Sequence, residues 1–399
     1  MFAILITITI TLVVALFLTP IIRKLAVHFK IFATPNHRTI HDASTPKLGG
    51  VAIFVAFVVG LSGLSLLTGS AAHIRAFLLG GTVVFIVGFL DDVHQLGCYQ
   101  KLAGQILAAM IAVGFGIHID SISLPLGYHL ELGLFGPVLS VLWILTLTNA
   151  LNLLDGLDGL AAGFSILAAL FIAIFAIIFG NVAVAAVAAL LIAATAGFFR
   201  YNFPPAKIFM GDTGSLFLGF TLGCLSLNML GPDSSGGNVP LLLVLFSIPL
   251  ADTILAVLRR LSQGIHPFHA DKKHIHHRLL EKGFGEIAAV FIVFLMTMVA
   301  GLTSLLLSIS NLQQGIIWFS GYVMLQFVFL KRLNCFDFFN KKDFLKDEVD
   351  SENQALEPKD MPQERYNQKT PREPYNEWSS KNDHFRQDSF PRKKFHSPA

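Results

Sequence analysis

Residues 134–159 read LFGPVLSVLWILTLTNALNLLDGLDG, an apolar run that ends in two amides and two carboxylates. About 20 mostly apolar residues are enough to cross the roughly 30 Å hydrocarbon layer of a bilayer. This run is long enough to do so, and its polar end would then lie at one membrane surface. The stretch therefore predicts a membrane-spanning helix that presents functional groups where it leaves the bilayer.

Similar apolar runs occupy most of the chain up to residue 333, so we predict an all-α polytopic membrane domain over 1–333. The first run lacks basic residues ahead of it and is followed by Arg23 and Lys24. This pattern favours a retained first helix over a cleaved signal peptide. The eleven predicted spans are 2–22, 49–68, 76–92, 103–118, 134–153, 160–179, 182–199, 213–230, 239–259, 286–308 and 314–331.

The composition excludes a secreted soluble protein. Of the 399 residues, 54% are hydrophobic and 14% are charged, whereas an average soluble protein carries about 25% charged residues. The net charge of +3 is too small to indicate nucleic-acid binding. The three cysteines lie far apart in the sequence and indicate no disulfide framework.

The charges concentrate at the C-terminal end. Of the 29 basic and 26 acidic residues, 25 lie from Asn334 onwards, where Pro, Asn, Gln and Ser alternate with charge. Such a segment cannot bury enough apolar surface to offset the entropy of ordering. We therefore predict that 334–399 is a disordered cytoplasmic tail, with a partner-docking arm as the alternative.

The loops between the predicted spans are asymmetric. If the N-terminus lies outside, every Lys and Arg except Arg75 falls on the cytoplasmic side, as the positive-inside rule requires. Insertion does not require the acidic residues to gather there too, yet four segments bring them to the same side. We therefore predict one site on the cytoplasmic face. These acidic residues are Asp91, Asp92, Asp155, Asp158, Asp212 and Asp271.

Residues 88–93, GFLDDV, end the third predicted span in two adjacent carboxylates. Two such charges 4 Å apart repel by about 4 kcal/mol at an effective dielectric constant of 20, unless a cation is near or one is protonated. A divalent metal ion, Lys101 or a role as proton acceptor would each account for Asp91 and Asp92. Solvated carboxylates at a helix end are the structural alternative.

The polar end of the 134–159 run is a second candidate. Its two amides are three residues apart and share a helix face, and its two glycines allow a ligand to approach the backbone closely. A polar turn between spans is the alternative, although four amide or carboxylate groups in ten residues favour a function. The candidate residues are Asn149, Asn152, Asp155 and Asp158.

A third candidate is 200–215, RYNFPPAKIFMGDTGS. Pro204 and Pro205 prevent a regular helix through the loop. The GDTGS segment then opens the next predicted span, and a helix N-terminus suits phosphate. Asp212 could cap that helix or hold a metal ion against a phosphate.

The fourth candidate, 266–278, reads HPFHADKKHIHHR. Zinc is one interpretation, since imidazoles bind it well, but no cysteine accompanies the histidines and the basic residues would repel a dication. A positive clamp on a diphosphate fits the composition better. His274 and Arg278 are four residues apart and share one face of a short helix. The candidate residues are Lys272, His274, His276, His277 and Arg278.

Asp252 lies inside the ninth predicted span, close to Pro249. Acidic residues at such a depth usually pair with a neighbouring helix, and an ion pathway is the alternative. Pairing is the interpretation we favour.

In this order, and together with TPKLGG at 45–50, the four motifs resemble the polyprenyl-phosphate N-acetylhexosamine-1-phosphate transferase family (glycosyltransferase 4 family). The resemblance covers roughly 45–283. The HIHH sequence at 274–277, followed by Arg278 and Leu279, resembles the undecaprenyl-phosphate alpha-N-acetylglucosaminyl 1-phosphate transferase branch. The three-histidine run typical of the peptidoglycan branch is absent from the sequence.

The resemblance implies roles for individual residues. Asp91 and Asp92 match the aspartate pair of the family, and Lys101 matches the lysine that follows it. Asp155 and Asp158 match the aspartates of its DGLDG motif, which also contains the two asparagines. Some relatives carry a lysine just after the aspartate pair, where this chain has none, so Lys101 is expected to be the only nearby cation.

The other matches concern the donor and the metal ion. By resemblance, Asp212 binds Mg²⁺, with Mn²⁺ as an alternative ion and Asp91 and Asp92 as further ligands. Asn202 and Phe209 match positions at the nucleotide, where Phe209 would stack on uracil. The histidines match a motif near the sugar diphosphate; they are His274, His276 and His277.

The family implies transfer of GlcNAc-1-phosphate from UDP-GlcNAc to undecaprenyl phosphate, which yields UMP and begins an O-antigen, common antigen or teichoic acid type polymer. It also implies a multi-pass protein of the bacterial cytoplasmic membrane, with a homodimer as an option. Another UDP-N-acetylhexosamine or UDP-MurNAc-pentapeptide is the alternative donor. A transporter or flippase ranks lower, because it should place charged or broken helices near the middle of the bilayer.

Overall fold

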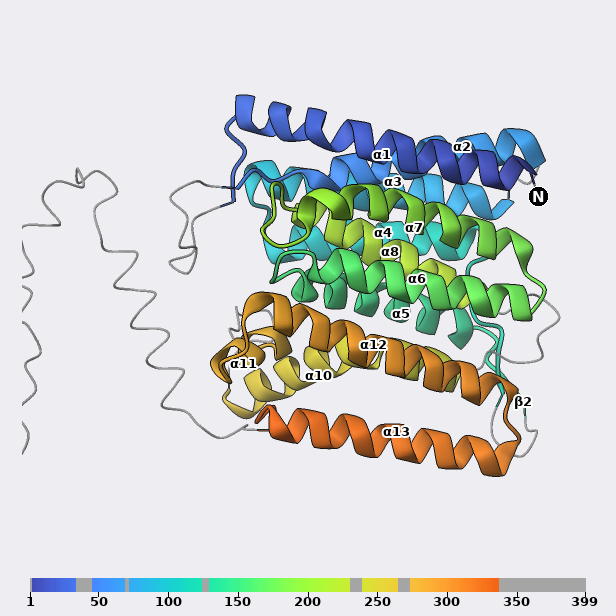
Figure 1. Cartoon of the computed structure of the whole chain (residues 1–399). Coiled ribbons are helices and arrows are strands. Elements are labelled where there is room, and N and C mark those ends of the chain that lie inside the picture. The colour runs from blue at the N-terminus through green and yellow to red at the C-terminus, as the bar shows by residue number, and fades with distance from the viewer. Residues whose placement is uncertain are drawn as a thin grey trace, which may run out of the picture. The chain divides into compact units, whose positions relative to one another are not determined.

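The computed structural model describes residues 2–33, 45–68, 72–123, 129–229, 239–264 and 273–336. Within these ranges the chain forms long helices that lie side by side (Figure 1). A small antiparallel sheet pairs β1 (Ser121–Ser123) with β2 (His129–Glu131). The helices are α1 (Phe2–His28), α2 (Gly49–Thr68), α3 (Ala72–His94), α4 (Cys98–Gly114), α5 (Phe135–Leu154), α6 (Leu160–Ile178), α7 (Val182–Asn202), α8 (Gly211–Asn228), α9 (Val239–Leu245), α10 (Ser247–Ser262), α11 (Ile275–Glu281), α12 (Glu286–Ile309) and α13 (Leu312–Arg332).

Each predicted span coincides with one helix, except 239–259, which coincides with α9 and α10. Among the described residues, seven helices are long and apolar enough to cross a membrane, and the α9–α10 pair is an eighth if it counts as one bent span. The described chain is thus a largely helical polytopic membrane protein. The count of eleven spans and the orientation stay predictions, as does the tail, because 337–399 lie outside the described residues.

The span predicted at 239–259 is bent, which the single expected helix did not anticipate. The axes of α9 and α10 differ by 78° around Phe246. Pro249 lies in the first turn of α10, where its missing N–H is tolerated. In a continuous helix its ring would clash with the carbonyl of Leu245, so the helix breaks between the two residues.

α8 is the buried centre of the bundle. All of its residues except Asp212 and Asn228 are buried, and it packs against α2, α3, α5, α6 and α7. Glycine permits this packing, since a Cβ on Gly219 would lie 2.6 Å from Cα of Thr148 in α5. Close backbone approach through small residues is a common way for helices to associate in membranes.

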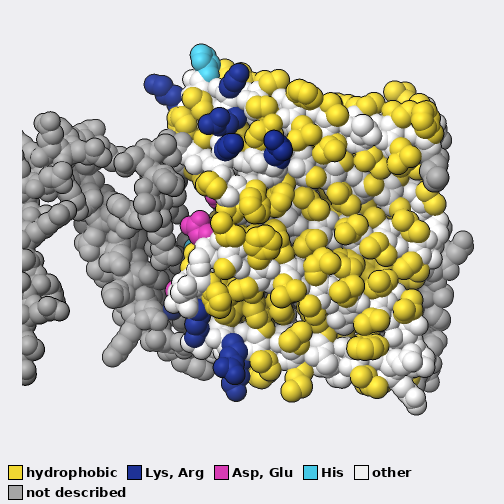
Figure 2. All heavy atoms as spheres, in the orientation of Figure 1, with side chains coloured by type: hydrophobic (Ala, Val, Ile, Leu, Met, Phe, Trp, Pro, Cys, Tyr) yellow, Lys and Arg dark blue, Asp and Glu magenta, His cyan; other side chains and the backbone are white. Residues whose placement is uncertain are grey.

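Charged side chains gather at one end of the bundle. On the face seen in Figure 2, Lys, Arg, Asp and Glu lie at one end, and apolar side chains cover the rest. The exposed apolar side chains include Phe17, Leu295 and Met324, from three different helices. A surface of this kind suits hydrocarbon, and the charged end suits an aqueous interface.

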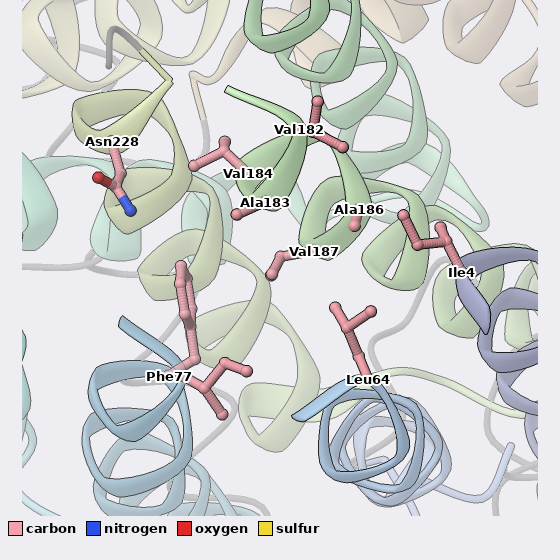
Figure 3. Close-up of a pocket in the computed structure, with 10 residues that line it drawn as sticks. Ile4, Leu64, Phe77, Val182, Ala183, Val184, Ala186, Val187 and Asn228 are labelled. Carbon is pink, nitrogen blue, oxygen red and sulfur yellow. The ribbon is translucent and has the colours of Figure 1, made fainter. Parts of the chain in front are cut away.

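An apolar pocket lies at the opposite end of the bundle (Figure 3). Its lining comes from the first residues of α1, α3 and α7 and the last residues of α2 and α8, among them Ile4, Leu64, Phe77 and Asn228. The ends of α3 and α8 that carry the acidic motifs are the other ends of those helices. The pocket is therefore separate from the charged end.

The contact between α3 and α8 depends on Gly88. A Cβ at this position would lie 2.5 Å from the carbonyl oxygen of Asp212. Gly88→Ala should therefore push the helices apart and lower the free energy of unfolding by about 1–3 kcal/mol. Thermal unfolding in detergent would measure the loss. Gly114→Ala is the control, since a Cβ there meets no atom within 4 Å; equal midpoints for the two variants would contradict the close contact.

Candidate active site

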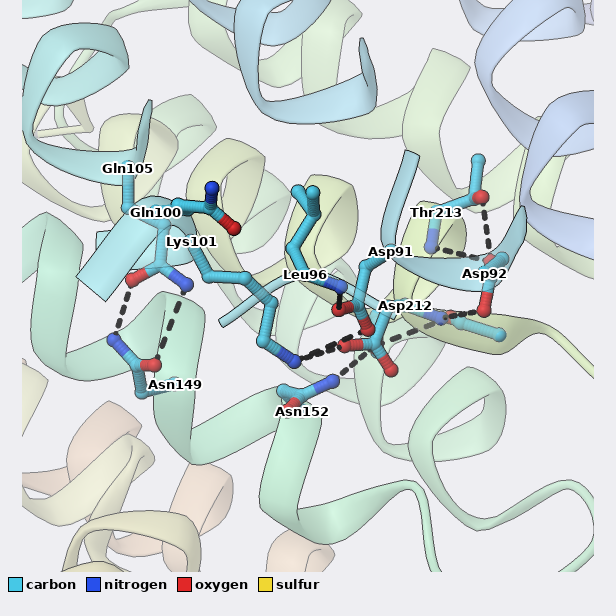
Figure 4. A network of polar contacts seen from close by, with 12 residues as sticks. Asp91, Asp92, Leu96, Gln100, Lys101, Gln105, Asn149, Asn152, Asp212 and Thr213 are labelled. Atoms are coloured by element: carbon cyan, nitrogen blue, oxygen red, sulfur yellow. Dashed lines mark hydrogen bonds and ion pairs between the residues drawn. The ribbon is translucent and has the colours of Figure 1, made fainter. Parts of the chain in front are cut away.

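Four helix ends meet at the charged end of the bundle (Figure 4). α3 ends in the predicted aspartate pair, and α4 begins close to Lys101. α5 runs into the turn that contains Asp155, and α8 begins next to Asp212. The structure thus brings together acidic motifs that are more than 100 residues apart in the sequence, as in the contact between Asp92 and Thr213.

Asp92 caps the N-terminus of α8 from another helix. Its Oδ1 accepts a hydrogen bond from the backbone N–H of Asp212 at 3.0 Å. Its Oδ2 accepts from the backbone N–H of Thr213 at 2.9 Å and from Thr213 Oγ1 at 2.6 Å. Gly211 has a φ of 73°, and a Cβ there would collide with the Asp92 carboxylate. The capping role considered for Asp212 is therefore filled by Asp92, whose side chain is 0% exposed.

Lys101 joins the two remaining carboxylates. Its Nζ lies 3.1 Å from Oδ2 of Asp91 and 2.8 Å from Oδ2 of Asp212. Asp91 also accepts a hydrogen bond from the backbone N–H of Leu96 at 2.9 Å, and its side chain is 15% exposed. Asn152 donates to Ser215 Oγ at 2.9 Å and also contacts the Asp212 carboxylate.

A second cation, Lys47, lies at the cluster, and the expectation that Lys101 is the only nearby one was wrong. Lys47 Nζ lies 3.6 Å from Oδ1 of Asp92. It arrives because the backbone of Pro46 and Gly49 pairs with Phe209, in bonds of 2.9 Å each. Gly50 also donates to the carbonyl of Met210 at 2.9 Å. Because such tertiary pairing leaves no local pattern, a lysine in TPKLGG was the sole sequence signal.

The cluster carries excess negative charge. It contains four carboxylates and two ammonium groups, which leaves two negative charges when all are ionised. Burial raises the pKa of Asp155 to about 8, and the neighbouring carboxylates of Asp212 and Asp92 raise it as well. The site is therefore prepared to take up positive charge. The carboxylates are Asp91, Asp92, Asp155 and Asp212, and the ammonium groups are Lys47 and Lys101.

Hydrogen bonds hold the DGLDG turn against the proline loop. Asp158 Oδ2 accepts from the backbone N–H of Ala206 at 2.7 Å. Asn202 accepts from the N–H of Gly159 at 3.1 Å and donates to the carbonyl of Ile208 at 3.0 Å. These bonds shape the loop in which Phe209 is half-buried. Contacts of Asn202 and Phe209 with a nucleotide stay predictions.

Asn149 faces the interior of the bundle. Its Nδ2 donates to Gln105 Oε1 at 2.7 Å and to the carbonyl of Leu145 at 2.8 Å. The buried Gln105 of α4 was not a candidate from sequence, because a single glutamine in an apolar run carries no motif. The pair joins α4 to α5 below the carboxylate cluster, and a substrate contact of Asn149 stays a prediction.

The histidine segment reaches the cluster through His276. Its ring packs directly on Gly156 of the DGLDG turn, where a side chain would have no room. The residue is 2% exposed, and neither ring nitrogen has a hydrogen-bond partner in the described parts of the chain. Burial lowers the pKa of His276 to about 3, helped by His277. The imidazole is therefore neutral at physiological pH.

The other candidates of this segment differ in their surroundings. His274 Nδ1 lies 2.9 Å from Asp252 Oδ2, which is the helix pairing favoured for Asp252. Arg278 donates to the carbonyls of Leu333 and Asn334 at 3.3 and 2.6 Å, so part of its guanidinium is already used within the protein. Diphosphate contacts of His274, His276, His277 and Arg278 stay predictions. Lys272 and Asp271 lie outside the described residues.

A ready-made metal cage is not seen among the described residues, where no group of three or more His, Cys, Asp or Glu is placed to hold an ion. Instead, the Asp91 and Asp212 carboxylates both contact the Nζ of Lys101. Two adjacent carboxylates are a partial ligand set. A substrate would have to complete it.

Because Asp92 caps α8, substituting Asp92 should cost more stability than substituting its neighbour Asp91. Asp92→Asn replaces an oxygen that accepts hydrogen bonds by an NH₂ group, so we expect the free energy of unfolding to fall by about 0.5–2 kcal/mol. Asp91→Asn should cost less, because Asp91 accepts only one backbone N–H and repels Asp212. Thermal unfolding of the two variants measures this difference. Equal losses would argue against the cap.

Asp155 makes stability depend on pH. Because its pKa is raised from 3.8 to about 8, the folded protein holds a proton that the unfolded chain has lost, and the free energy of unfolding falls as pH rises from 6.5 to 8. Below pH 6.5 the lowered pKa of His276 has the opposite effect, because the unfolded chain then binds a proton that the folded protein does not. The free energy of unfolding contributed by His276 therefore rises with pH in that range. Unfolding midpoints at pH 6.5 and 8 should therefore differ less in Asp155→Asn than in the wild type; an identical shift would contradict the assignment.

Comparison with known proteins places this arrangement in a family. Residues 74–230 match the model of glycosyl transferase family 4. A "probable undecaprenyl-phosphate N-acetylglucosaminyl 1-phosphate transferase" of Bacillus subtilis is 35% identical over 81% of this chain and 89% of its own length.

Two other relatives have related names. A decaprenyl-phosphate N-acetylglucosaminephosphotransferase of Mycolicibacterium smegmatis is 35% identical over 71% of this chain and 77% of its own length. An undecaprenyl-phosphate alpha-N-acetylglucosaminyl 1-phosphate transferase of Yersinia pestis is 30% identical over 68% of this chain and 76% of its own length. Since the match to the first relative spans nearly all of that protein, the chain belongs to glycosyl transferase family 4.

Proposed function

We propose that this protein transfers GlcNAc-1-phosphate from UDP-GlcNAc to undecaprenyl phosphate, which yields GlcNAc-diphospho-undecaprenol and UMP. The observation that carries the proposal is the carboxylate cluster at the charged end of an apolar bundle, in a chain whose relatives are named for this transfer. The product would begin a cell-surface polysaccharide of the O-antigen, common antigen or teichoic acid type.

The position of the cluster fits the two substrates. A prenyl phosphate keeps its chain in the hydrocarbon and its phosphate at the interface, whereas a sugar nucleotide stays in water. They can meet only at the membrane surface, so the reacting groups belong at helix ends. This argument supports the proposed orientation, with eleven spans, the N-terminus outside and the cluster on the inner face of the bacterial cytoplasmic membrane. A homodimer rests on the family resemblance alone.

The residues at the cluster fit a magnesium ion. Mg²⁺ is commonly held by one or two protein carboxylates together with substrate phosphates, and the excess negative charge that remains here when Asp155 is protonated would favour a dication. Asp212 and Asp91 would hold the ion, with Asp92 as a more distant candidate and Mn²⁺ as the alternative metal. When bound, the ion would stabilise the charge that develops on the diphosphate.

The protein groups would divide the remaining work. Asp91 is the better base of the pair, because Asp92 is buried and already accepts three hydrogen bonds. Asp91 would take the remaining proton of the lipid phosphate. The freed oxygen would then form a bond to the sugar-linked phosphorus, while the bond from that phosphorus to the UMP oxygen breaks. His274 would stabilise the negative charge during this one-step transfer.

Two alternatives remain distinct from this proposal. Another UDP-N-acetylhexosamine or UDP-MurNAc-pentapeptide would keep the chemistry and change the donor. A transporter or flippase gains some support from the bend between α9 and α10, because broken helices are typical of that class. Asp252, the acidic residue deep in α10, is however bound to His274, which argues against a free ion-binding site there.

The experiment follows UMP release by purified protein with undecaprenyl phosphate, Mg²⁺ and a panel of UDP-sugars. Release with UDP-GlcNAc alone, abolished by a chelator, is the expected result. Release with a different UDP-N-acetylhexosamine would move the protein to a neighbouring donor class. No release with any donor, in folded protein, would overturn the transferase proposal.

Asp212→Asn tests the metal assignment in the same assay. We expect kcat to fall by about 100-fold or more, since metal polarisation contributes several kcal/mol. Asp120→Asn is the matched control, because Asp120 pairs with His118 beyond the far end of α4. Near-normal turnover of Asp212→Asn would show that the metal assignment is wrong. A labelled enzyme–phosphosugar adduct formed without lipid would instead overturn one-step transfer.

A further inference from the structure

Asp252 is an acidic residue that the proposed reaction does not yet use. It lies in the first half of α10 and is 4% exposed. A carboxylate buried among helices is costly unless it is paired, and this one lies outside the carboxylate cluster. What it pairs with therefore indicates why it is there.

Both oxygens of Asp252 bind the start of α11. Oδ2 lies 2.9 Å from Nδ1 of His274, and Oδ1 accepts a hydrogen bond from the backbone N–H of Ile275 at 2.8 Å. The carboxylate thus holds the ring and the adjoining backbone at the same time. A seven-residue helix such as α11 has little rigidity of its own, so this contact determines how His274 is presented.

Two arginines hold the residue before His274. Arg259 Nη2 and Arg278 Nε donate to the carbonyl of Lys273 at 3.2 and 3.1 Å. The backbone is therefore restrained on both sides of His274, by arginines before it and by Asp252 after it. Such restraint is what a side chain needs if its ring must keep one orientation.

The pairing also selects a protonation form of the ring. A carboxylate accepts but does not donate, so it favours the imidazole form with hydrogen on Nδ1. Nε2 is then the nitrogen left for a ligand. The His274 ring is nearly parallel to that of His276, 5.9 Å away, and His276 packs on Gly156 in the DGLDG turn. The two rings thus connect Asp252 to the turn that contains Asp155.

We propose that Asp252 is a positioning residue for the transfer reaction, which keeps hydrogen on Nδ1 of His274 and so orients the Nε2 edge of the ring towards the sugar-nucleotide diphosphate, to which Nε2 donates when it also carries hydrogen. This inference rests on the proposed function. Asp252 itself would not touch the substrate, and it would act only through His274.

A double-variant cycle tests this dependence. Asp252→Asn should lower kcat for UMP release by about 10- to 100-fold, the usual effect of removing a partner that orients a functional histidine, with KM for UDP-GlcNAc changed by less than about two-fold. His274→Ala should be at least as impaired, and the double variant no worse than His274→Ala alone. Losses that multiply in the double variant would overturn the proposal.

Thr253→Val is the matched control in the same turn of α10. Among the residues that the structure describes, its hydroxyl bonds only the carbonyl of Pro249 within the helix, at 2.8 Å, and the substitution keeps the shape of the side chain. Turnover should stay within about two-fold of the wild type, as for a surface-neutral change. A loss equal to that of Asp252→Asn would mean that any change in this turn disturbs the fold, which would overturn the specific role of Asp252.

A second measurement does not depend on activity. In protein labelled with ¹⁵N-histidine, the His274 signal is identified by its loss in His274→Ala. We expect the wild type to show hydrogen on Nδ1, whether or not Nε2 also carries one. A ring with hydrogen on Nε2 alone would overturn the proposal even if the enzyme is active. If no UDP-sugar supports UMP release, the proposed function fails, and this measurement still decides whether Asp252 controls the ring.

Discussion

The capping of α8 by Asp92 is the contact on which the rest of the molecule depends. It joins the last turn of one helix to the first turn of another, and three donors from Asp212 and Thr213 converge on one carboxylate. The first N–H groups of a buried helix have no water to bind, so leaving them unpaired would be costly. The glycines Gly88 and Gly211 let the two backbones come close enough for this contact.

The cap also separates the roles of two adjacent residues. Successive residues on a helix point about 100° apart, so Asp92 turns into the bundle towards α8 while Asp91 turns towards Lys101. The carboxylate of Asp92 serves to hold the site together, and that of Asp91 stays partly exposed. The two adjacent aspartates look redundant in the sequence but therefore have different roles in the structure.

Helix positions could be predicted from the sequence because a bilayer demands long apolar runs, and composition alone reveals them. The bend at Phe246 was missed, although Pro249 was noted, because a proline in a first turn is compatible with either a straight or a broken chain. Lys47 was missed because only tertiary pairing with the segment at Phe209 brings it to Asp92. Likewise, no local pattern indicates that Asn149 pairs with Gln105.

The burial of α8 has a consequence for how the protein is made. A helix without a lipid-facing side, rich in Gly, Ser and Thr, gains little from entering hydrocarbon alone. The helices against which α8 packs most extensively are α2, α3, α5, α6 and α7, and all precede it in the chain. During synthesis, the helices against which α8 packs are therefore made before α8 emerges. The helix that depends most on its neighbours for insertion thus follows all five of them.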